Sequence, residues 1–304
     1  MITRRELGTF LAGAAALPLR GAVAGKHGFV KSICSIIFPD GQPLAESFAQ
    51  AKRAGFDAME LRIGADVPLD SSAANLQKTA EAARQAGIAI ATLWVSEPLQ
   101  KNPLNSDSAD SRARGVAAIL RSIEVAHHLG CDALLLYPGR LGSGARLDVG
   151  YEATWQRFTA ELKKTLPAAE RAKIYLNPEN VWNKFLVSPL EMRTFVDQFH
   201  SPWLQTHFDI GNVMQFGYPQ DWILTLGPRI KRVHVKDYKL SAQAEQGRFV
   251  DLLEGDVDWK AVMAALVKTG YRGYLSPEVS FDPKQQPDQL RRVSQQLDQI
   301  ISMA

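Results

Sequence analysis

Short apolar runs alternate with longer amphipathic segments from about residue 29 to the end of the chain. The apolar runs have the length and composition of buried strands, and the segments between them follow the period of an amphipathic helix. Several of these segments end in glycine, the residue that a left-handed helix cap favours. The candidate strands are VKSICSIIF, DAMELRI, IAIATLWVS, DALLLYPG, KIYLNPE, LQTHFDIG, IKRVHVKD and GYLSPEVS.

Eight strands that alternate with helices predict an α/β fold with an all-parallel sheet. Eight such units in about 275 residues fit a closed, eight-stranded (β/α)8 TIM barrel better than an open doubly wound sheet. No glycine-rich dinucleotide or P-loop fingerprint follows the first strand, which also disfavours the open sheet. We therefore expect residues 25–304 to form one barrel domain.

Residues 1–24 depart from this pattern and resemble a twin-arginine signal peptide. Arg4 and Arg5 precede a mildly apolar segment rich in alanine and glycine, and Ala22-Val23-Ala24 supplies a small-x-small cleavage site. The alternative is an amphipathic N-terminal helix. The resemblance predicts a periplasmic protein that is exported already folded, a route often taken by proteins that carry a metal or cofactor.

Composition and charge narrow the class of protein. The apolar fraction of 46% and the charged fraction of 22% are ordinary for a globular protein with a substantial core. The signal carries three arginines and one glutamate, so its removal lowers the formal net charge from +3 to +1. A nearly neutral protein gives no electrostatic reason to expect binding to nucleic acid or to a membrane. Outside the N-terminus, no apolar run is long enough to cross a bilayer.

The two cysteines, Cys34 and Cys131, lie in apolar runs, so we expect buried free thiols. A disulfide between them stays open, because the sequence gives no distance. Two cysteines and six histidines are also too few for a histidine-rich or cysteine-rich metal cluster.

Four ionisable residues stand late in the apolar runs of the fifth to eighth strands, where the active site of a TIM barrel lies. They are Glu179, Asp209, His234 and Glu278. Strand alternation turns all four toward the barrel interior. Three carboxylates and one imidazole that converge there would repel one another unless a cation joined them. This oxygen-rich set favours Mn²⁺, Mg²⁺ or Co²⁺ over a sulfur-coordinated structural zinc. Four unrelated ion pairs would not explain their occurrence on consecutive strands.

These four residues and the motifs around them make the chain resemble members of the xylose isomerase-like TIM barrel superfamily. The resemblance is to its group of sugar phosphate isomerases/epimerases. The resemblance runs from the first strand to the last helix. Its strongest motifs are PENVWNKFLVSP, FDIGN, RVHVKD, EGDVDW and SPEV. It implies that the four residues above are the ligands of one divalent metal ion, with Mn²⁺ favoured and Mg²⁺, Co²⁺ or Zn²⁺ as alternatives.

Resemblance to the ketose 3-epimerases implies that Glu179 and Glu278 also act as an acid/base pair. The metal polarises the carbonyl of a free ketose or keto-sugar and stabilises an enediolate. One glutamate then removes the adjacent proton, and the other returns a proton to the opposite face. The alternative is a lyase or dehydratase that uses the same site on a keto-sugar, keto-glycoside or inosose.

Two departures from the family pattern leave the substrate open. Free-ketose epimerases tend to have a histidine three residues after the strand-six aspartate, where this chain has Asn212. They also tend to have an arginine shortly after the strand-seven histidine, where only Lys236 and Lys239 occur. The motifs HxKD and DIGN resemble those of pentulose-phosphate epimerases. A periplasmic enzyme, however, would meet few sugar phosphates. Since no phosphate-binding cluster is evident, we prefer an unphosphorylated sugar.

Further residues are candidates for contact with the sugar: Glu60, Trp94, Tyr137, Asn180, Trp182, Asn212 and Lys236. Lys236 is the best cation for a substrate oxygen, the alternative being a salt bridge to Asp237 or Glu254. Glu60 fits substrate contact or an internal ion pair. Trp94 and Trp182 fit apolar walls or plain core packing. We interpret His207 as a hydrogen-bonded core histidine rather than a ligand.

Residues 237–256 form the one long irregular segment, which predicts an active-site lid, a partner-binding loop or a surface insertion. Two other functional classes fit less well. A nuclease resembling endonuclease IV would need several more histidines at the strand ends. A non-catalytic barrel would not need competent residues at all four ligand positions. The expected partner is a small-molecule sugar, and formation of a homo-oligomer stays open.

Overall fold

A computed structural model describes residues 25–241, 247–285 and 287–304. The expected signal peptide, residues 1–24, lies outside the described residues. Eight strands of the described part form one sheet in the order β7-β4-β3-β2-β1-β12-β9-β8, and all their pairings are parallel. Their bounds are β1 (Phe29–Cys34), β2 (Ala58–Arg62), β3 (Ala89–Trp94), β4 (Ala133–Leu136), β7 (Tyr175–Pro178), β8 (Thr206–Asp209), β9 (Ile230–Val235) and β12 (Gly273–Pro277).

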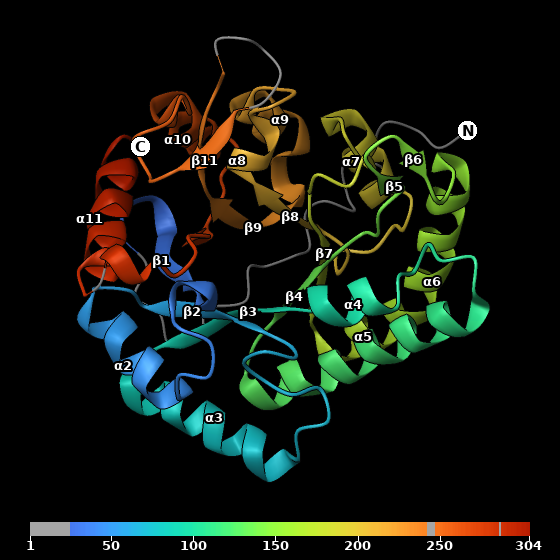
Figure 1. Ribbon diagram of the computed structural model, residues 1–304, viewed down its shortest axis with the longest axis horizontal. Helices are drawn as coiled ribbons and strands as arrows, with labels where there is room; N and C mark the ends of the chain where they lie inside the picture. Colours follow the sequence, from blue (N-terminus) through green and yellow to red (C-terminus); the bar gives the residue numbers. More distant parts are fainter. Residues whose placement is uncertain (1–24, 242–246, 286) are drawn as a thin grey trace, which may run out of the picture.

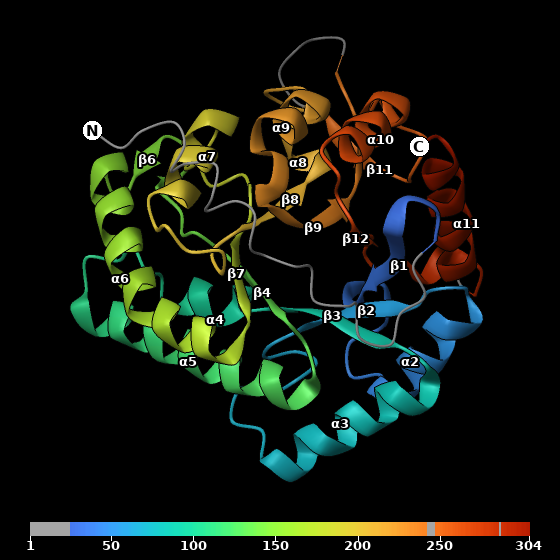
Figure 2. The same cartoon turned by 180° about the vertical axis from the view of Figure 1, so that it is seen from behind.

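Bridges between β7 and β8 join the two ends of this sheet. Leu176 pairs with Leu204, and Glu179 pairs with His207, both in parallel. The sheet is therefore a nearly closed barrel with the helices outside it, as Figures 1 and 2 show. The predicted eight-stranded TIM barrel is confirmed.

Each barrel strand is followed by at least one helix, and three of the longer helices start at a serine cap. Ser72, Ser108 and Ser188 each accept a hydrogen bond from a backbone N–H of the first turn. The α-helices are α2 (Leu44–Arg53), α3 (Ala73–Ala86), α4 (Ser96–Lys101), α5 (Ala109–Leu129), α6 (Tyr151–Ala172), α7 (Pro189–Asp197), α8 (Ile210–Val213), α9 (Pro219–Leu226), α10 (Trp259–Lys268) and α11 (Gln289–Ser302). Short 3-10 helices are η1 (Lys26–Gly28), η2 (Ser35–Ile37), η3 (Gly227–Arg229) and η4 (Pro283–Gln285).

Two small hairpins extend from the C-terminal ends of the barrel strands. The first, β5 (Gly142–Ser143) with β6 (Arg146–Leu147), follows β4, and the second, β10 (Asp237–Lys239) with β11 (Arg248–Val250), follows β9. The expectation of an irregular segment over residues 237–256 is therefore wrong for residues 237–239 and 248–250, which pair as a hairpin, while its other described residues are irregular.

Asp237 is the physical reason for this regularity, because its buried carboxylate accepts hydrogen bonds from several residues of the segment and its flank. Oδ1 accepts hydrogen bonds from the backbone N–H groups of Tyr238 at 2.8 Å and Val257 at 3.3 Å. Oδ2 accepts from the Leu253 N–H at 2.9 Å and from the indole N–H of Trp259 at 3.0 Å. A carboxylate with four donors is stable in the interior, so both ends of the segment are anchored to the barrel.

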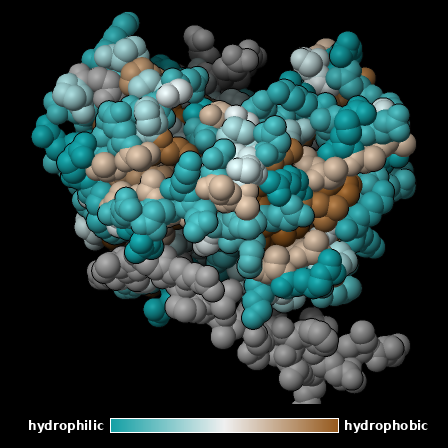
Figure 3. Space-filling view, turned by 90° about the horizontal axis from the view of Figure 1, so that it is seen from below, coloured by the Kyte–Doolittle hydropathy of each residue, from teal (hydrophilic) through white to brown (hydrophobic). Residues whose placement is uncertain are grey.

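The expectation about the two cysteines is met. Cys34 and Cys131 are free and buried. Among the described residues, none of the helices combines the length and apolar character needed to span a bilayer. The face shown in Figure 3 is mostly hydrophilic, with small apolar patches between polar residues.

The N-terminal end of the barrel interior is filled by a charged side chain, Arg232 of β9. It is only 1% exposed, and its guanidinium donates two hydrogen bonds to the carbonyl of Ala91 on β3, at 2.9 and 3.1 Å. It also pairs with Asp132 and lies 4.9 Å from the ring centroid of Tyr274 on β12. A single cation therefore links opposite parts of the barrel wall below the active-site end.

We expect Arg232→Met to lower the free energy of unfolding by about 3 kcal/mol, because it leaves the carbonyl of Ala91 and the carboxylate of Asp132 without their partner. Urea denaturation followed by circular dichroism measures the loss. The control is Arg229→Met, which removes an ion pair with the half-exposed Asp197 and should change stability by about 1 kcal/mol or less. Equal losses in the two variants would contradict the role of Arg232.

Candidate active site

Four side chains meet at the C-terminal ends of β7, β8, β9 and β12: Glu179, Asp209, His234 and Glu278. We call them the carboxylate–histidine cluster. Their candidate ligand atoms all lie within 4.8 Å of one another. His234 is central, since its Nδ1 is 3.1 Å from Glu179 Oε1, 3.2 Å from Glu278 Oε2 and 3.6 Å from Asp209 Oδ2. The Glu278 side chain is 19% exposed and the other three are buried, so the cluster opens toward solvent beside Glu278.

Two asparagines fix the position of Asp209. The side chain of Asn180 accepts from the Asp209 N–H and donates to the Asp209 carbonyl, both at 2.8 Å. The Asn212 N–H donates to Asp209 Oδ1 at 2.8 Å, as the cap of α8, and the Asn212 amide donates to the Asn180 carbonyl at 2.9 Å. The side chains of Asn180 and Asn212 therefore both bond to backbone groups around Asp209.

Lys236 lies within the cluster as a counter-charge. Its Nζ is 2.6 Å from Glu278 Oε2 and 2.9 Å from Asp209 Oδ2. Burial alone would lower the pKa of Lys236, but the nearby carboxylates raise it well above its ordinary value. The salt bridge to Asp237 or Glu254 that the sequence left open is thus replaced by ion pairs with two members of the cluster.

The two glutamates of the cluster differ in their electrostatic surroundings. Burial raises the pKa of Glu179 to about 7. Burial acts in the same direction on Glu278, but Lys236 and His234 hold the pKa of Glu278 well below its ordinary value. Carboxyl groups whose pKa values are separated in this way are typical of sites that use one acid and one base.

The cluster has the donor set of a divalent cation site. Three carboxylates and one imidazole supply oxygen and nitrogen donors, the types that such ions prefer. Asp209 Oδ2 and Glu278 Oε2 are buried, and the cation that faces them is Lys236, at 2.9 and 2.6 Å. Its single charge faces only two of the three carboxylates, and buried carboxylates need a donor or a cation, so the residues fit a further bound cation.

Glu60, a candidate for substrate contact, lies on the other side of the His234 ring. Its Oε2 is 3.1 Å from His234 Nε2 and accepts a hydrogen bond from the indole N–H of Trp94 at 2.6 Å. Its Oε1 accepts from the Ser276 hydroxyl at 2.6 Å, and the side chain is fully buried. Of the two interpretations of Glu60, the internal ion pair is the one that these contacts support.

His207 lies in the barrel core, as expected, with its ring centroid 4.0 Å from that of His234. The expected hydrogen bonds are not found, since neither ring nitrogen has a partner among the described residues. Burial lowers the pKa of His207 well below its ordinary value, so the ring is neutral. Tyr137, another candidate, is half-buried after β4 and packs against the hydrophobic core.

Three aromatic rings form a surface beside the cluster, which we call the aromatic platform. Trp182 and Phe249 are 45% and 42% exposed, and their rings stack with centroids 5.0 Å apart. Both meet the buried ring of Tyr238 edge to face, at 5.7 and 5.2 Å. The Trp182 indole donates to the Asn212 carbonyl at 2.9 Å, and Lys236 Nζ lies 5.0 Å from the Phe249 ring centroid. These contacts place the platform next to the cluster.

Sequence reasoning missed two members of the platform, Phe249 and Tyr238. They stand opposite each other in the β10–β11 hairpin. The sequence does contain a signal for this hairpin, because an aromatic residue follows a charged one in both DYK and RFV. The signal is overlooked when the whole segment is interpreted as irregular.

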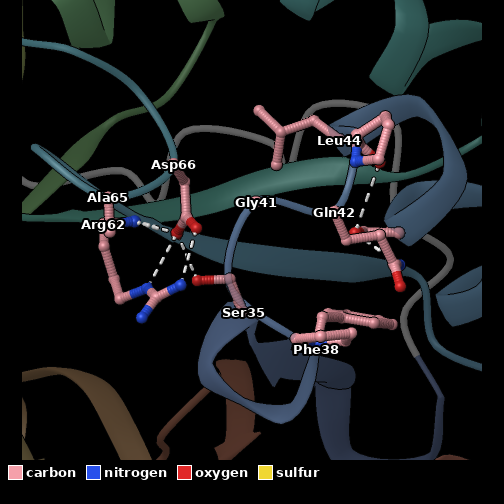
Figure 4. A pocket seen from close by; sticks show the side chains of 11 residues that line it. Ser35, Phe38, Gly41, Gln42, Leu44, Arg62, Ala65 and Asp66 are labelled. Carbon is pink, nitrogen blue, oxygen red and sulfur yellow. Dashed lines mark hydrogen bonds and ion pairs between the residues drawn. The ribbon is translucent and has the colours of Figure 1, made fainter.

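A separate cavity of about 260 Å³ lies beyond the ends of β1 and β2 (Figure 4). Within it, the guanidinium of Arg62 bonds to the carboxylate of Asp66 at 2.9 and 3.1 Å, and the Ser35 hydroxyl donates to the same carboxylate. No residue of the carboxylate–histidine cluster lines this cavity. The charge of Arg62 is therefore balanced locally.

Comparisons with known proteins agree with this architecture. L-ribulose-5-phosphate 3-epimerase UlaE of Escherichia coli O1:K1 / APEC is 27% identical over 244 residues, which cover 77% of this chain and 81% of that protein. The solved structure of D-psicose 3-epimerase from Clostridium cellulolyticum H10 superposes with a TM-score of 0.75 at 16% identity, over 90% of this chain and 99% of that one.

A third relative, 3-keto-D-glucoside 4-epimerase YcjR from E. coli, superposes with a TM-score of 0.71 at 14% identity, again over 90% of this chain and 99% of that one. At such identities the two structures show the common fold alone. The family model described as "Xylose isomerase-like TIM barrel" matches residues 48–300, which is most of the chain. The protein therefore belongs to the xylose isomerase-like TIM barrel family.

Proposed function

We propose that the protein is a divalent-metal-dependent epimerase or isomerase that acts next to the carbonyl of a free ketose or keto-sugar. The observation that carries this proposal is the convergence of three carboxylates and an imidazole at the mouth of the barrel. Its similarity to proteins named as sugar 3-epimerases adds support.

In the proposed reaction, the four side chains of the cluster hold one divalent ion, with Mn²⁺ favoured and Mg²⁺, Co²⁺ or Zn²⁺ as alternatives. When bound, the ion supplies the positive charge that acidifies the C–H bond beside the carbonyl. Glu179 and Glu278 come from β7 and β12 and approach His234 Nδ1 at similar distances, 3.1 and 3.2 Å. One glutamate takes the proton, and the electron pair of the broken C–H bond stays on the sugar and forms the enediolate. The other glutamate returns a proton to the opposite face.

The charges around the cluster support an unphosphorylated sugar. Besides Lys236, whose partners belong to the cluster, Lys239 and Arg62 lie near the C-terminal ends of the strands, and each pairs with at least one carboxylate. A phosphate site needs cations or backbone N–H groups that are free to bind it. Trp182 and Phe249 instead offer apolar ring faces, while Lys236 and Tyr137 are our candidates for contact with substrate oxygens. We also propose that the protein works in the periplasm, on the basis of Arg4 and Arg5.

Metal binding is tested by thermal unfolding of EDTA-treated protein. At a free Mn²⁺ concentration 100 times the Kd, the ion should stabilise the folded state by about 2.7 kcal/mol. Asp209→Asn should lose most of the resulting rise in Tm, because it replaces a buried ligand. The control Asp256→Asn, whose carboxylate is paired with Lys239, should keep it. Absence of any shift in the wild-type protein would contradict the metal site.

Proton transfer is tested by exchange in D₂O. We expect the wild-type protein to incorporate deuterium beside the carbonyl of a ketose or keto-glycoside. Glu179→Gln and Glu278→Gln should each slow epimerisation by about 100- to 10,000-fold, since each removes an acid/base group. The exposed Glu254 supplies the matched control Glu254→Gln, which should be active.

Mass spectrometry of the products separates the two reaction classes. An epimer keeps the substrate mass apart from deuterium, whereas loss of water or of an alcohol would establish the lyase or dehydratase alternative. A broad panel of ketoses and keto-glycosides that gains no deuterium and loses no group would rule out both.

The aromatic platform generates a prediction about substrate binding. Phe249→Ala should raise KM by roughly 2- to 10-fold, because an aromatic contact contributes about 0.5–1.5 kcal/mol, while kcat changes little. Phe216→Ala is the control, since Phe216 is 46% exposed but contacts Trp222 of α9 instead of the platform. Steady-state kinetics of both variants measure the difference, and equal KM values for the wild type and Phe249→Ala would contradict it.

A further inference from the structure

We propose that Glu60 is a positioning residue for the metal-binding histidine. It holds the His234 ring with the proton on Nε2, so that the lone pair of Nδ1 faces the three carboxylates of the cluster. This inference rests on the proposed metal site, and it assigns a role to a residue that reaches neither the ion nor the sugar.

The two ring nitrogens of His234 face different surroundings. Nδ1 has the three carboxylates of the cluster at 3.1 to 3.6 Å. Nε2 has one carboxylate oxygen, Glu60 Oε2, at 3.1 Å. An ionised carboxylate can only accept a hydrogen bond, so Nε2 donates to Glu60. The three carboxylates would require a proton on Nδ1 as well if no ion were bound, so in the proposed site the ion takes the place of that proton. A neutral imidazole with its proton on Nε2 has its lone pair on Nδ1, which is the state that binds a metal.

Glu60 is itself held from two further sides. Trp94 on β3 donates to Oε2 and Ser276 on β12 donates to Oε1, both at 2.6 Å. Ser276 stands directly beside His234 in the parallel pairing of β12 with β9. The rotation of the Glu60 carboxylate is therefore fixed by β3, next to β2, and by β12, which lies beyond β1. The Trp94 ring, 5.0 Å from that of His234, limits tilting of the imidazole.

Glu60 is too deeply buried to contact a substrate, which supports a positioning role instead. Glu60 and Ser276 are both 0% exposed, and both oxygens of Glu60 are already bonded. A buried carboxylate without partners would be strongly destabilising, so its position under His234 requires the imidazole as well as the two other donors. Carboxylates that accept from the second nitrogen of a ligating histidine usually fix its tautomer, and their loss weakens metal binding by about 10- to 100-fold.

The variants separate charge from geometry. Glu60→Gln can still accept from Trp94 and His234 through its amide oxygen and donate to the Ser276 hydroxyl, so it keeps the orientation and removes the charge. Glu60→Ala removes both. Ser276→Ala leaves the His234 contact in place and frees one side of the carboxylate. We expect the Kd for Mn²⁺, measured by titration calorimetry, to rise by about 100-fold in Glu60→Ala and by about 10-fold or less in the other two.

A matched control uses another buried glutamate. Glu161 of α6 is 4% exposed and pairs with Arg112 of α5 at 3.1 Å, so its partner lies on an outer helix and not in the cluster. Glu161→Gln should lower Tm and leave the Kd for Mn²⁺ unchanged. A role for Glu60 in stability alone would make its variants behave like this control.

The tautomer gives a second readout that does not depend on activity. In ¹⁵N-labelled, Mg²⁺-loaded protein, the His234 ring should show a protonated Nε2 and an unprotonated Nδ1 by NMR. Ser276→Ala and Glu60→Gln should keep this state, and Glu60→Ala should show a mixture. If Glu60→Ala does not fold, the inference is still overturned by a wild-type ring that carries its proton on Nδ1.

The outcomes also distinguish this inference from the proposed function. A wild-type protein that binds Mn²⁺ while Glu60→Ala binds it equally well overturns the inference and leaves the metal enzyme standing. A wild-type protein that processes no sugar, but whose metal affinity falls as expected in Glu60→Ala, overturns the epimerase and supports the role of Glu60. A wild-type protein that binds no divalent ion overturns both.

Discussion

The carboxylates at the mouth of the barrel repel one another, and the other residues of the site compensate for this repulsion. Glu179, Asp209 and Glu278 all lie within 3.6 Å of one imidazole nitrogen, and burial makes their negative charges harder to tolerate. The protein surrounds them with positive or hydrogen-bonding groups. Lys236 faces two of the three, and Asn180 fixes the backbone of Asp209. The barrel thus holds in place a group of charges that would separate in a flexible chain.

The interior of the barrel is layered by polarity along its axis. At the N-terminal end, Arg232 lies against apolar residues such as Ala91 and is anchored to backbone carbonyls. Above it, Glu60 links His234 to β3 and β12. The carboxylate–histidine cluster occupies the open end. Each layer joins strands that are far apart in sequence, so the closure of the barrel and the geometry of the site stabilise each other.

Much of the fold and the cluster could be predicted because they depend on local patterns. Strand alternation and the position of each charge at a strand end located Asp209 and His234 without any knowledge of contacts. The role of Glu60 could not be found in this way, since its partner His234 is 174 residues further along the chain. The same holds for Asn180, whose amide bonds to the backbone of a neighbouring strand. Alternation tells which face a side chain takes, whereas its partner depends on barrel closure.

The anchoring of Asp237 has a consequence for how such a protein can change in evolution. Its carboxylate fixes the base of the β10–β11 hairpin through four N–H donors, while Phe249 lies on the opposite strand of that hairpin. Substitutions at the exposed positions of β11 can therefore reshape the surface beside the cluster while Asp237 keeps the base of the hairpin fixed. In the proposed enzyme, the segment that contacts the sugar can thus vary independently of the barrel residues that carry out the reaction.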